Sequence, residues 1–576
     1  MVDAASYSSA IGSYDPTFVQ GGAISLSLLV FLACTAWGAR LVFGIWPCLR
    51  VLAFGRGCSG KAAMQAIQAS SFGDGSLLGN LAQEFCEDFS ADGAALPFGR
   101  VGATITLYWA STCSGSEVVL LVLLAIACYY QECGVNVKFR HRFSCECKPA
   151  KQKWIQGLFD ELGVEKGCLF ERAEAMTEEY AHCVTHNQKC KVPSCDIMIA
   201  GTSCKDFRKA SSKLAAAEVL LHTSTSGGSA QTLWALLTYL SLHSVGILLL
   251  ENSDTLDDAN PAGKSMQTAL DIVVSEIRSH GMTPCSLLTD SLLFGHPQER
   301  RRFYIVAVKS SGSMLFDFAA RPLAMVFASL KECLVRCQRQ APCLTELFWP
   351  SDSMCVEALL NARVSKGVRV NQYNVSAVVK TYKLGGVRWG DVDLNQELQA
   401  SIWYGTLPSH VREVFRYSKA EKSEVLCRDI SQSVSRVRYS KLVDGRHVVP
   451  CKCPEQLVWV EMPGEEPRLQ LGKESMLIQG FLVSKVPRLV ASTPDNELMS
   501  LGGNMMASVL PLAILQSLFV SLPWRPDACT EDRLVAVSEG DVADAMFSFN
   551  AMLSEEDNGA SQPCCSLKRR RKDTVR

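Results

Sequence analysis

Residues 104–134 read TITLYWASTCSGSEVVLLVLLAIACYYQECG and contain a strand, a turn and a helix in direct succession. The first eight residues are rich in β-branched and aromatic side chains, which favour a buried strand. Residues 113–117, CSGSE, place a glycine where the backbone must turn. The next run is apolar on every face and ends at Gly134, which predicts a buried helix too short to span a bilayer. This unit predicts the start of an α/β domain.

The same alternation continues to residue 309. Short apolar strands separated by helices of this length are typical of βαβ units. We therefore predict an α/β fold with a doubly wound, mainly parallel sheet, whose ligands lie beyond the carboxyl ends of the strands. The further strands are expected at 138–146, 195–201, 245–252, 283–290 and 301–309, and the helices at 149–163, 229–244 and 263–281.

The places where this alternation of strands and helices begins, stops and returns divide the chain into five regions. The alternation is lost after Lys309, and amphipathic helical patterning returns at Arg468, so the chain is expected to come back and complete its first domain. The predicted regions are an N-terminal extension (1–103), the first domain (104–310), a second domain (311–467), a return segment (468–530) and a C-terminal tail (531–576).

Composition restricts the partners and the compartment. The 576 residues carry 57 Lys and Arg against 58 Asp and Glu, so any nucleic-acid surface must be local. The 25 cysteines are an odd number, and we find no CxxC motif paired with a second CxxC or with two histidines at zinc spacing. Without a cleavable signal, they are expected to be reduced thiols of an intracellular protein with no metal site.

Two terminal segments bear on location. Residues 19–39 are uncharged and long enough to span a bilayer, although Asp3 and Asp15 stand where a signal peptide carries positive charge. We interpret this segment as a packed helix, with a membrane association as the alternative. The run LKRRRK, Leu567 to Lys572, has the form of a nuclear import signal or a phosphate-binding patch, and we predict a nuclear protein.

Polar residues recur at the predicted functional edge of the sheet. The glycine turn followed by an acid at the end of the second strand, Glu146, suggests an adenosine-containing cofactor. Cys204 follows a buried strand through a Gly-Thr-Ser turn and is a candidate nucleophile. Further candidates at strand ends are Glu251, Asn252, Gln298, Arg300 and Arg302.

In this order, the motifs of residues 104–309 and 468–524 resemble those of the C5-cytosine-specific DNA methyltransferase family. The resemblance implies a class I, Rossmann-like fold that uses S-adenosyl-L-methionine, with a smaller target-recognition domain inserted at 311–467. It also implies DNA as the partner. An RNA cytosine-5 methyltransferase, acting for example on tRNA, and a catalytically impaired scaffold of the same fold are the alternatives.

The resemblance assigns a role to each candidate. Cys204 would add to C6 of a flipped cytosine, Glu251 would bind the ring at N3 and its amine, and Arg300 with Arg302 would complete the catalytic set. Arg436 and Arg438, with Lys441 and Arg446, surround Tyr439 in the sequence, and basic residues interleaved with an aromatic suit phosphate contact and stacking. The predicted substrate contacts are Ser203, Asn252, Gln298, Arg436 and Arg438, and the predicted cofactor contacts are Cys113, Ser114, Gly115, Ser116, Glu117, Glu146 and Asn504.

The sequence departs from the family pattern at three places. Ser203 stands where the family has proline, and Lys205 where it has glutamine. The acid that opens the family's cofactor loop is missing near Ser111. These changes bear on the rate of the reaction more than on the fold.

Overall fold

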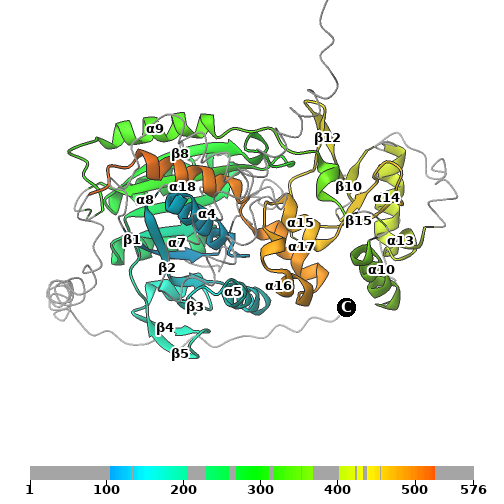
Figure 1. The fold of residues 1–576 in the computed structure, drawn as a ribbon, viewed down its shortest axis with the longest axis horizontal. Coiled ribbons are helices and arrows are strands. Elements are labelled where there is room, and N and C mark those ends of the chain that lie inside the picture. The colour runs from blue at the N-terminus through cyan, green and yellow to red at the C-terminus, as the bar shows by residue number, and fades with distance from the viewer. Residues whose placement is uncertain are drawn as a thin grey trace, which may run out of the picture. The chain divides into compact units, whose positions relative to one another are not determined.

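The structure, a computed structural model, describes most of residues 104–525 (Figure 1). The apolar segment 19–39 and the basic run 568–572 therefore lie outside the described residues. Within 104–525, the undescribed positions are 114, 133, 204–228, 259–266, 311–312, 314, 350, 352, 367–400, 422–424, 432–436 and 455.

A nine-stranded sheet organises the first domain, in the order β5-β4-β3-β2-β1-β6-β7-β9-β8. The central strands β3, β2, β1, β6 and β7 are parallel, and antiparallel pairs extend both edges. The predicted α/β fold with a parallel centre is confirmed. The strands are β1 (Thr104–Thr112), β2 (Asn136–Cys145), β3 (Cys168–Phe170), β4 (Tyr180–Cys183), β5 (Gln188–Lys191), β6 (Ile197–Ala200), β7 (Ile247–Ser253), β8 (Met282–Asp290) and β9 (Arg301–Lys309).

Helices cover both faces of this sheet. In β7, Ile247 and Leu249 face one core while Leu248 and Leu250 face the other, as the two-residue period of a strand requires. Because both faces are buried, the strand is a continuous apolar run. One face carries α4 (Val118–Glu132), α5 (Pro149–Leu162), α9 (Leu323–Arg336) and α18 (Val509–Ser521), and the other carries η1 (Ala173–Thr177), α7 (Ser229–Leu242) and α8 (Ala269–Ser279).

The chain returns to the first domain through α18, which contacts α4 and α9 (Figure 1). All its residues are buried except Val520, which is half-buried. The first core also includes α9 and extends to Cys337. The boundary predicted at residues 310/311 is therefore about one helix too early, because the apolar stripe of α9 packs on α18 and not in the second domain.

The second domain has its own small core around Trp403, Phe415 and Trp459. It contains a four-stranded sheet, β11-β10-β14-β15, and the hairpin β12-β13. Its elements are α10 (Met354–Lys366), α13 (Ile402–Gly405), α14 (Ser409–Glu421), β10 (Cys427–Asp429), β11 (Arg438–Tyr439), β12 (Lys441–Val443), β13 (Arg446–Val448), β14 (Val458–Val460) and β15 (Arg468–Leu469).

Short helices join the second domain back to α18. These are α15 (Gly472–Ile478), α16 (Pro487–Ser492) and α17 (Asp495–Asn504). The remaining short helices are η3 (Asp254–Asp257), η4 (Ser291–Leu293), η5 (Leu344–Leu347) and η7 (Val483–Lys485). No single helix in the described part of the chain is long and apolar enough to cross a membrane, and the bent pair α17–α18 meets the length and composition of a span only when both are taken together.

Candidate active site

The direction of β9 brings the predicted residues to one edge of the sheet. β9 runs antiparallel to β7, so Arg302 pairs with Ser253 and Tyr304 with Glu251. The start of β9 therefore lies at the edge where the parallel strands β1, β2, β6 and β7 end. A parallel β9 would have carried its first residues to the opposite edge of the sheet.

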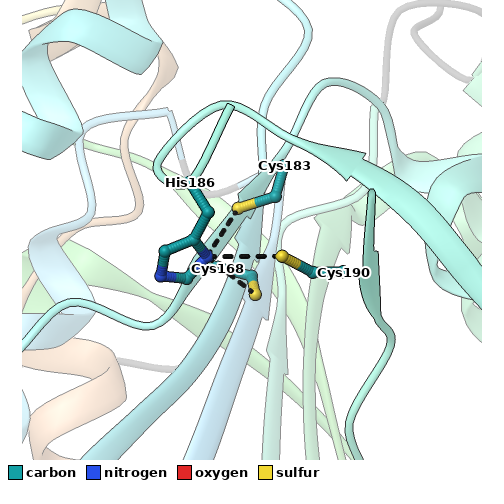
Figure 2. A group of neighbouring side chains, drawn as sticks. All are labelled: Cys168, Cys183, His186 and Cys190. Atoms are coloured by element: carbon teal, nitrogen blue, oxygen red, sulfur yellow. Dashed lines mark hydrogen bonds between the residues drawn. The ribbon is translucent and has the colours of Figure 1, made fainter. Parts of the chain in front are cut away.

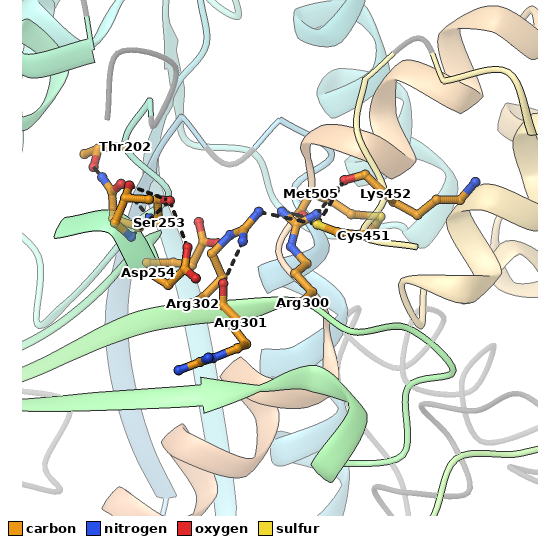
Figure 3. Close-up of polar contacts among 12 residues, drawn as sticks. Thr202, Ser253, Asp254, Arg300, Arg301, Arg302, Cys451, Lys452 and Met505 are labelled. Atoms are coloured by element: carbon orange, nitrogen blue, oxygen red, sulfur yellow. Dashed lines mark hydrogen bonds and ion pairs between the residues drawn. The ribbon is translucent and has the colours of Figure 1, made fainter. Parts of the chain in front are cut away.

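Glu251 and Arg302 form a buried ion pair at this edge. Arg302 Nε lies 3.0 Å from Glu251 Oε1, and each residue is 8% exposed. Arg302 Nη1 also donates to the carbonyl of Arg301 at 2.7 Å (Figure 3). A Cβ added at Gly201 would lie 3.9 Å from Glu251 Oε2, so the end of β6 passes close to the carboxylate. The ion pair fixes the carboxylate at the mouth of the site.

The loop after β6 is anchored just before the predicted nucleophile. Asn252 Nδ2 donates to Thr202 Oγ1 at 2.9 Å, and the Ser203 N–H donates to Thr232 Oγ1 on α7 at 3.2 Å. Cys204 itself lies outside the described residues. The amide of Asn252 and the backbone of Ser203 hold the loop, so in this structure both residues position the chain next to Cys204.

Gln298 and Arg300 both make hydrogen bonds to the second domain and the return segment. Gln298 is fully buried; its Nε2 donates to Gln479 Oε1 at 2.7 Å and its Oε1 accepts from the Lys452 N–H at 2.9 Å. Arg300 donates to the carbonyls of Lys452 (3.3 Å) and Met505 (2.9 Å) (Figure 3). These contacts join the residues just before β9 to the second domain and the return segment, and the substrate contact of Gln298 and the catalytic role of Arg300 stay predictions.

The predicted cofactor loop between β1 and α4 has an unusual backbone. Cys113, Gly115 and Glu117 all have positive φ, of 56°, 69° and 55°. Two of these residues carry side chains, so the conformation costs energy that the surroundings must offset. Glu117 is fully buried, and its Oε2 accepts from Ser111 Oγ (2.9 Å) and Ser144 Oγ (2.8 Å). The Glu117 carboxylate thus ties β1 to β2, and its predicted cofactor contact stays a prediction.

The rest of this loop is held from α5. The carbonyl of Ser116 accepts from Trp154 Nε1 at 2.9 Å, and the Ser116 side chain is buried. Ser114 lies outside the described residues. Burial raises the pKa of the Cys113 thiol to about 12, so it stays protonated at neutral pH and is a poor nucleophile.

Gly115, Glu146 and Asn504 lie around the same loop. A Cβ added at Gly115 would lie 3.6 Å from Asn504 Cβ and 3.4 Å from Lys151 Nζ. Glu146 follows β2, and its Oε1 accepts from the Lys148 N–H at 2.9 Å. Lys151 was missed from the sequence, where it reads as an ordinary lysine of an amphipathic helix. The loop thus combines a glycine bend, a buried cation and a carboxylate, which is a donor set that suits an amino acid attached to a ribose.

The second domain adds a cavity next to Arg302. The cavity, about 390 Å³, is lined by Arg438 and Cys451 among others. Arg302 Nη2 lies 3.9 Å from Cys451 Sγ. A hydrogen bond with Cys453, helped by the guanidinium groups of Arg302 and Arg300, lowers the pKa of Cys451 well below its ordinary value. Arg438 lines this cavity and its substrate contact stays a prediction, whereas Arg436 lies outside the described residues.

The sequence predicted no metal ligands, but four potential ligands meet in the structure. The donor atoms of Cys168, Cys183, His186 and Cys190 all lie within 4.8 Å of one another. The signal in the sequence is Cys-x2-His-x3-Cys at 183–190. It was missed because it contains no CxxC motif, and because Cys168 comes from a neighbouring strand. The expectation of no metal site is therefore corrected to a candidate site.

Known proteins provide independent comparisons. Residues 175–336 match the family model described as C-5 cytosine-specific DNA methylase. A DNA (cytosine-5-)-methyltransferase, DMT5, of Cryptococcus neoformans is 32% identical over 145 residues, which are 25% of this chain and 6% of that protein. The match thus spans a small part of the relative's length.

Two solved structures align over most of this chain at low identity. The methyltransferase EhMeth of Entamoeba histolytica aligns with 72% of this chain and 98% of its own at 9% identity and a TM-score of 0.37. A DNMT2 mutant of Spodoptera frugiperda aligns with 72% and 99% at 13% identity and a TM-score of 0.36.

Proposed function

We propose, from the premise that this chain carries a C-5 cytosine-specific DNA methylase domain in residues 175–336, that the protein transfers a methyl group to C5 of cytosine in DNA. The observation that carries the proposal is the Glu251–Arg302 ion pair beside the anchored loop that leads to Cys204. A carboxylate and a guanidinium at one sheet edge, with a cysteine next in sequence to the anchored loop, suit chemistry on a flat, polar ring. A base within a duplex has to be flipped out to reach them.

Cys204 would supply the nucleophile. Its thiolate adds to C6 of the ring, which moves electron density to C5; after C5 has taken the methyl group, its proton leaves and the thiolate is expelled. Glu251 would hold the ring at N3 and at the exocyclic amine, where charge changes as the thiolate adds. Arg302 orients that carboxylate, and Asn252 with Thr232 sets the position of the loop.

S-adenosyl-L-methionine is the proposed cofactor, and it supplies an electrophilic methyl group on a sulfonium. The bend at Gly115 lies beside Asn504 and Lys151, and Lys151 would provide a positive charge for the cofactor's carboxylate. Glu146 at the end of β2 is in the position where an acid accepts hydrogen bonds from ribose hydroxyls. Asn504, from the return segment, closes the loop from the other side.

The test is transfer of labelled methyl from S-adenosyl-L-methionine to duplex DNA, single-stranded DNA and total tRNA. We expect label in DNA with the wild type and none with Cys204→Ala, because the thiol is the group that activates C5. Cofactor binding, measured by calorimetry, should be the same in both proteins. Cys355→Ala is the matched control, since Cys355 is exposed on α10 and should leave transfer unchanged.

Other outcomes separate the alternatives. Label in tRNA alone would replace DNA with RNA as the substrate. Absence of transfer from a protein that binds the cofactor would favour a scaffold that has kept the fold and lost the chemistry. A covalent adduct on DNA that contains 5-fluorocytosine, formed by wild type and not by Cys204→Ala, would identify the thiol directly.

We also propose a nuclear location, supported by the five consecutive basic residues 568–572. A fluorescent fusion should lose nuclear accumulation when these five residues are changed to alanine. The alternative, attachment to a membrane through residues 19–39, predicts instead that the fusion sediments with membranes and that the basic run makes no difference.

A further inference from the structure

The edge of the nine-stranded sheet farthest from β9 carries a compact cluster of three thiols and one imidazole (Figure 2). Cys168 begins β3, Cys183 ends β4, His186 lies in the turn that follows, and Cys190 lies in β5. Nδ1 of His186 lies 3.6 Å from Cys168 Sγ, 3.3 Å from Cys183 Sγ and 3.4 Å from Cys190 Sγ. The three sulfur atoms thus surround one ring nitrogen.

These distances match the edges of a coordination tetrahedron. An ion bound at about 2.3 Å to sulfur and about 2.0–2.1 Å to nitrogen in tetrahedral geometry holds those two atoms about 3.6 Å apart. Hydrogen bonding does not explain the arrangement as well, because one ring nitrogen offers either one N–H or one lone pair. It can therefore satisfy one of the three sulfurs. A cation at the centre accounts for all three contacts.

The local fold gives such an ion a structural purpose. β3 has 3 residues, and β4 and β5 have 4 each. Strands this short form a hairpin that is marginal in water without further support. The side chains of β5 are exposed or half-buried, so apolar burial contributes little there. Four ligands from three consecutive strands and their turn would fasten the hairpin to the sheet.

The surroundings also suit thiolate ligands. The N–H of Leu169 donates to Cys183 Sγ at 3.4 Å, which favours the deprotonated sulfur. Lys189 and Lys191 flank Cys190 in the sequence. Their positive charge offsets the single net negative charge that three thiolates, a neutral imidazole and a divalent cation carry together.

We propose that Cys168, Cys183, His186 and Cys190 form a structural zinc site. Thiolate and imidazole donors select Zn²⁺ over Mg²⁺ or Ca²⁺, which require oxygen ligands. Four protein ligands leave no open position for a substrate, so the site holds the fold and does not take part in methyl transfer. Binding deprotonates up to three thiols and is therefore weaker at low pH.

The site also bears on the segment between β3 and β4. This segment contains η1, which packs on α7 with Met176 fully buried. Glu171, just after β3, lies 3.2 Å from the ring of His182 on β4. Because both ends of the segment leave from strands that the ion would join, loss of the ion should loosen residues 171–192 together, and the rest of the sheet much less.

The first experiment measures the metal content of the full chain purified without chelators. We expect one zinc per chain by mass spectrometry of elements, and a greatly reduced content in Cys183→Ser and in His186→Ala. His186→Cys keeps four ligands and should retain the metal. Cys355→Ser, which changes an exposed cysteine far from the cluster in sequence, is the matched control and should bind zinc as the wild type does.

A second measurement guards against variants that fail to fold. Wild-type protein stripped with a chelator and reloaded with Co²⁺ should show the absorption bands of a tetrahedral thiolate-bound ion, and hydrogen exchange should report faster opening of residues 171–192 in the stripped form. Wild-type protein that carries no zinc and gives no such bands would overturn the proposal. So would a disulfide between two of the three cysteines in protein purified under reducing conditions.

Discussion

At the scale of single residues, the site depends on the pair of Glu251 and Arg302. Each is 8% exposed, so neither charge can be relieved by solvent if the other is removed. Breaking one partner of a buried ion pair costs about 3–5 kcal/mol, while removing both together often costs little. A comparison of single and double variants can therefore distinguish the contribution of the pair to stability from the catalytic role that we propose for the Glu251 carboxylate.

Glu251→Gln should therefore lose both stability and activity. We expect the free energy of unfolding to fall by about 3–5 kcal/mol and methyl transfer to fall by at least about 100-fold, because the amide cannot stabilise charge as the carboxylate does. Urea unfolding and the transfer assay measure the two effects. Glu332→Gln, which alters an exposed pair on α9, should change neither.

The double variant Glu251→Gln/Arg302→Met completes the test. It should recover most of the stability, because no uncompensated charge remains, and none of the activity. Recovery of activity together with stability would show that Glu251 matters only for folding.

Some of these residue roles could be predicted from the sequence and others could not. Glu251 and Asn252 end a continuous apolar strand, so their position at the functional edge follows from the pattern alone. Gln298 was predicted to contact the substrate and Arg300 to be catalytic because they stand just before a strand and because the family resemblance implies these roles. Their partners Gln479 and Met505 lie 181 and 205 residues later, and no local pattern indicates them.

At the scale of elements, strand direction was the main uncertainty. Periodicity identifies β9 as a strand but does not give its direction, and the direction decides which end carries Arg302 to the site. The short connection between β8 and β9, residues 291–300, fits an antiparallel neighbour, whereas a parallel one needs a longer crossover. Connection length was thus the available signal.

The junction of β15 and α15 depends on one buried carboxylate. Glu474 accepts two hydrogen bonds from Arg468, at 2.7 and 3.1 Å, and one each from the N–H groups of Leu471 (2.7 Å) and Trp349 (2.8 Å). Arg468 and Glu474 are 1% and 0% exposed. Five residues separate Arg468 from Glu474 in the sequence, and the geometry shows what this spacing does: the pair joins the second domain to the return segment.

Glu474→Gln should weaken this junction strongly. Arg468 would keep its buried charge without a counter-ion, which costs about 3–5 kcal/mol. The midpoint of urea unfolding should fall accordingly, while Glu357→Gln in the exposed first turn of α10 should leave it within about 0.5 kcal/mol of the wild type. An unchanged midpoint in Glu474→Gln would mean that the junction does not contribute to global stability.

At the scale of the whole molecule, the second domain is an insertion into the first. The first core is formed by residues up to Cys337 and by residues of the return segment that include α18, so it contains two stretches that are far apart in the chain. The sequence predicted the return because amphipathic helical patterning reappears at Arg468 after a stretch without regular alternation of strands and helices. The boundary that it predicted at residues 310/311 is too early. The apolar stripe of α9 shows that this helix is buried but does not show in which core.

The guanidinium of Arg300 lies where the first domain, the second domain and the return segment meet. Arg300 directly precedes β9 and donates hydrogen bonds to the carbonyls of Lys452 and Met505. Its side chain thus connects the first domain, the second domain and the return segment. A shift of Lys452 relative to Met505 would strain or break the hydrogen bonds of Arg300. Arg302, which forms the ion pair with Glu251, is two residues further along the chain. Closure of the second domain on a bound polymer and placement of the Glu251 carboxylate should therefore be coupled through residues 300–302.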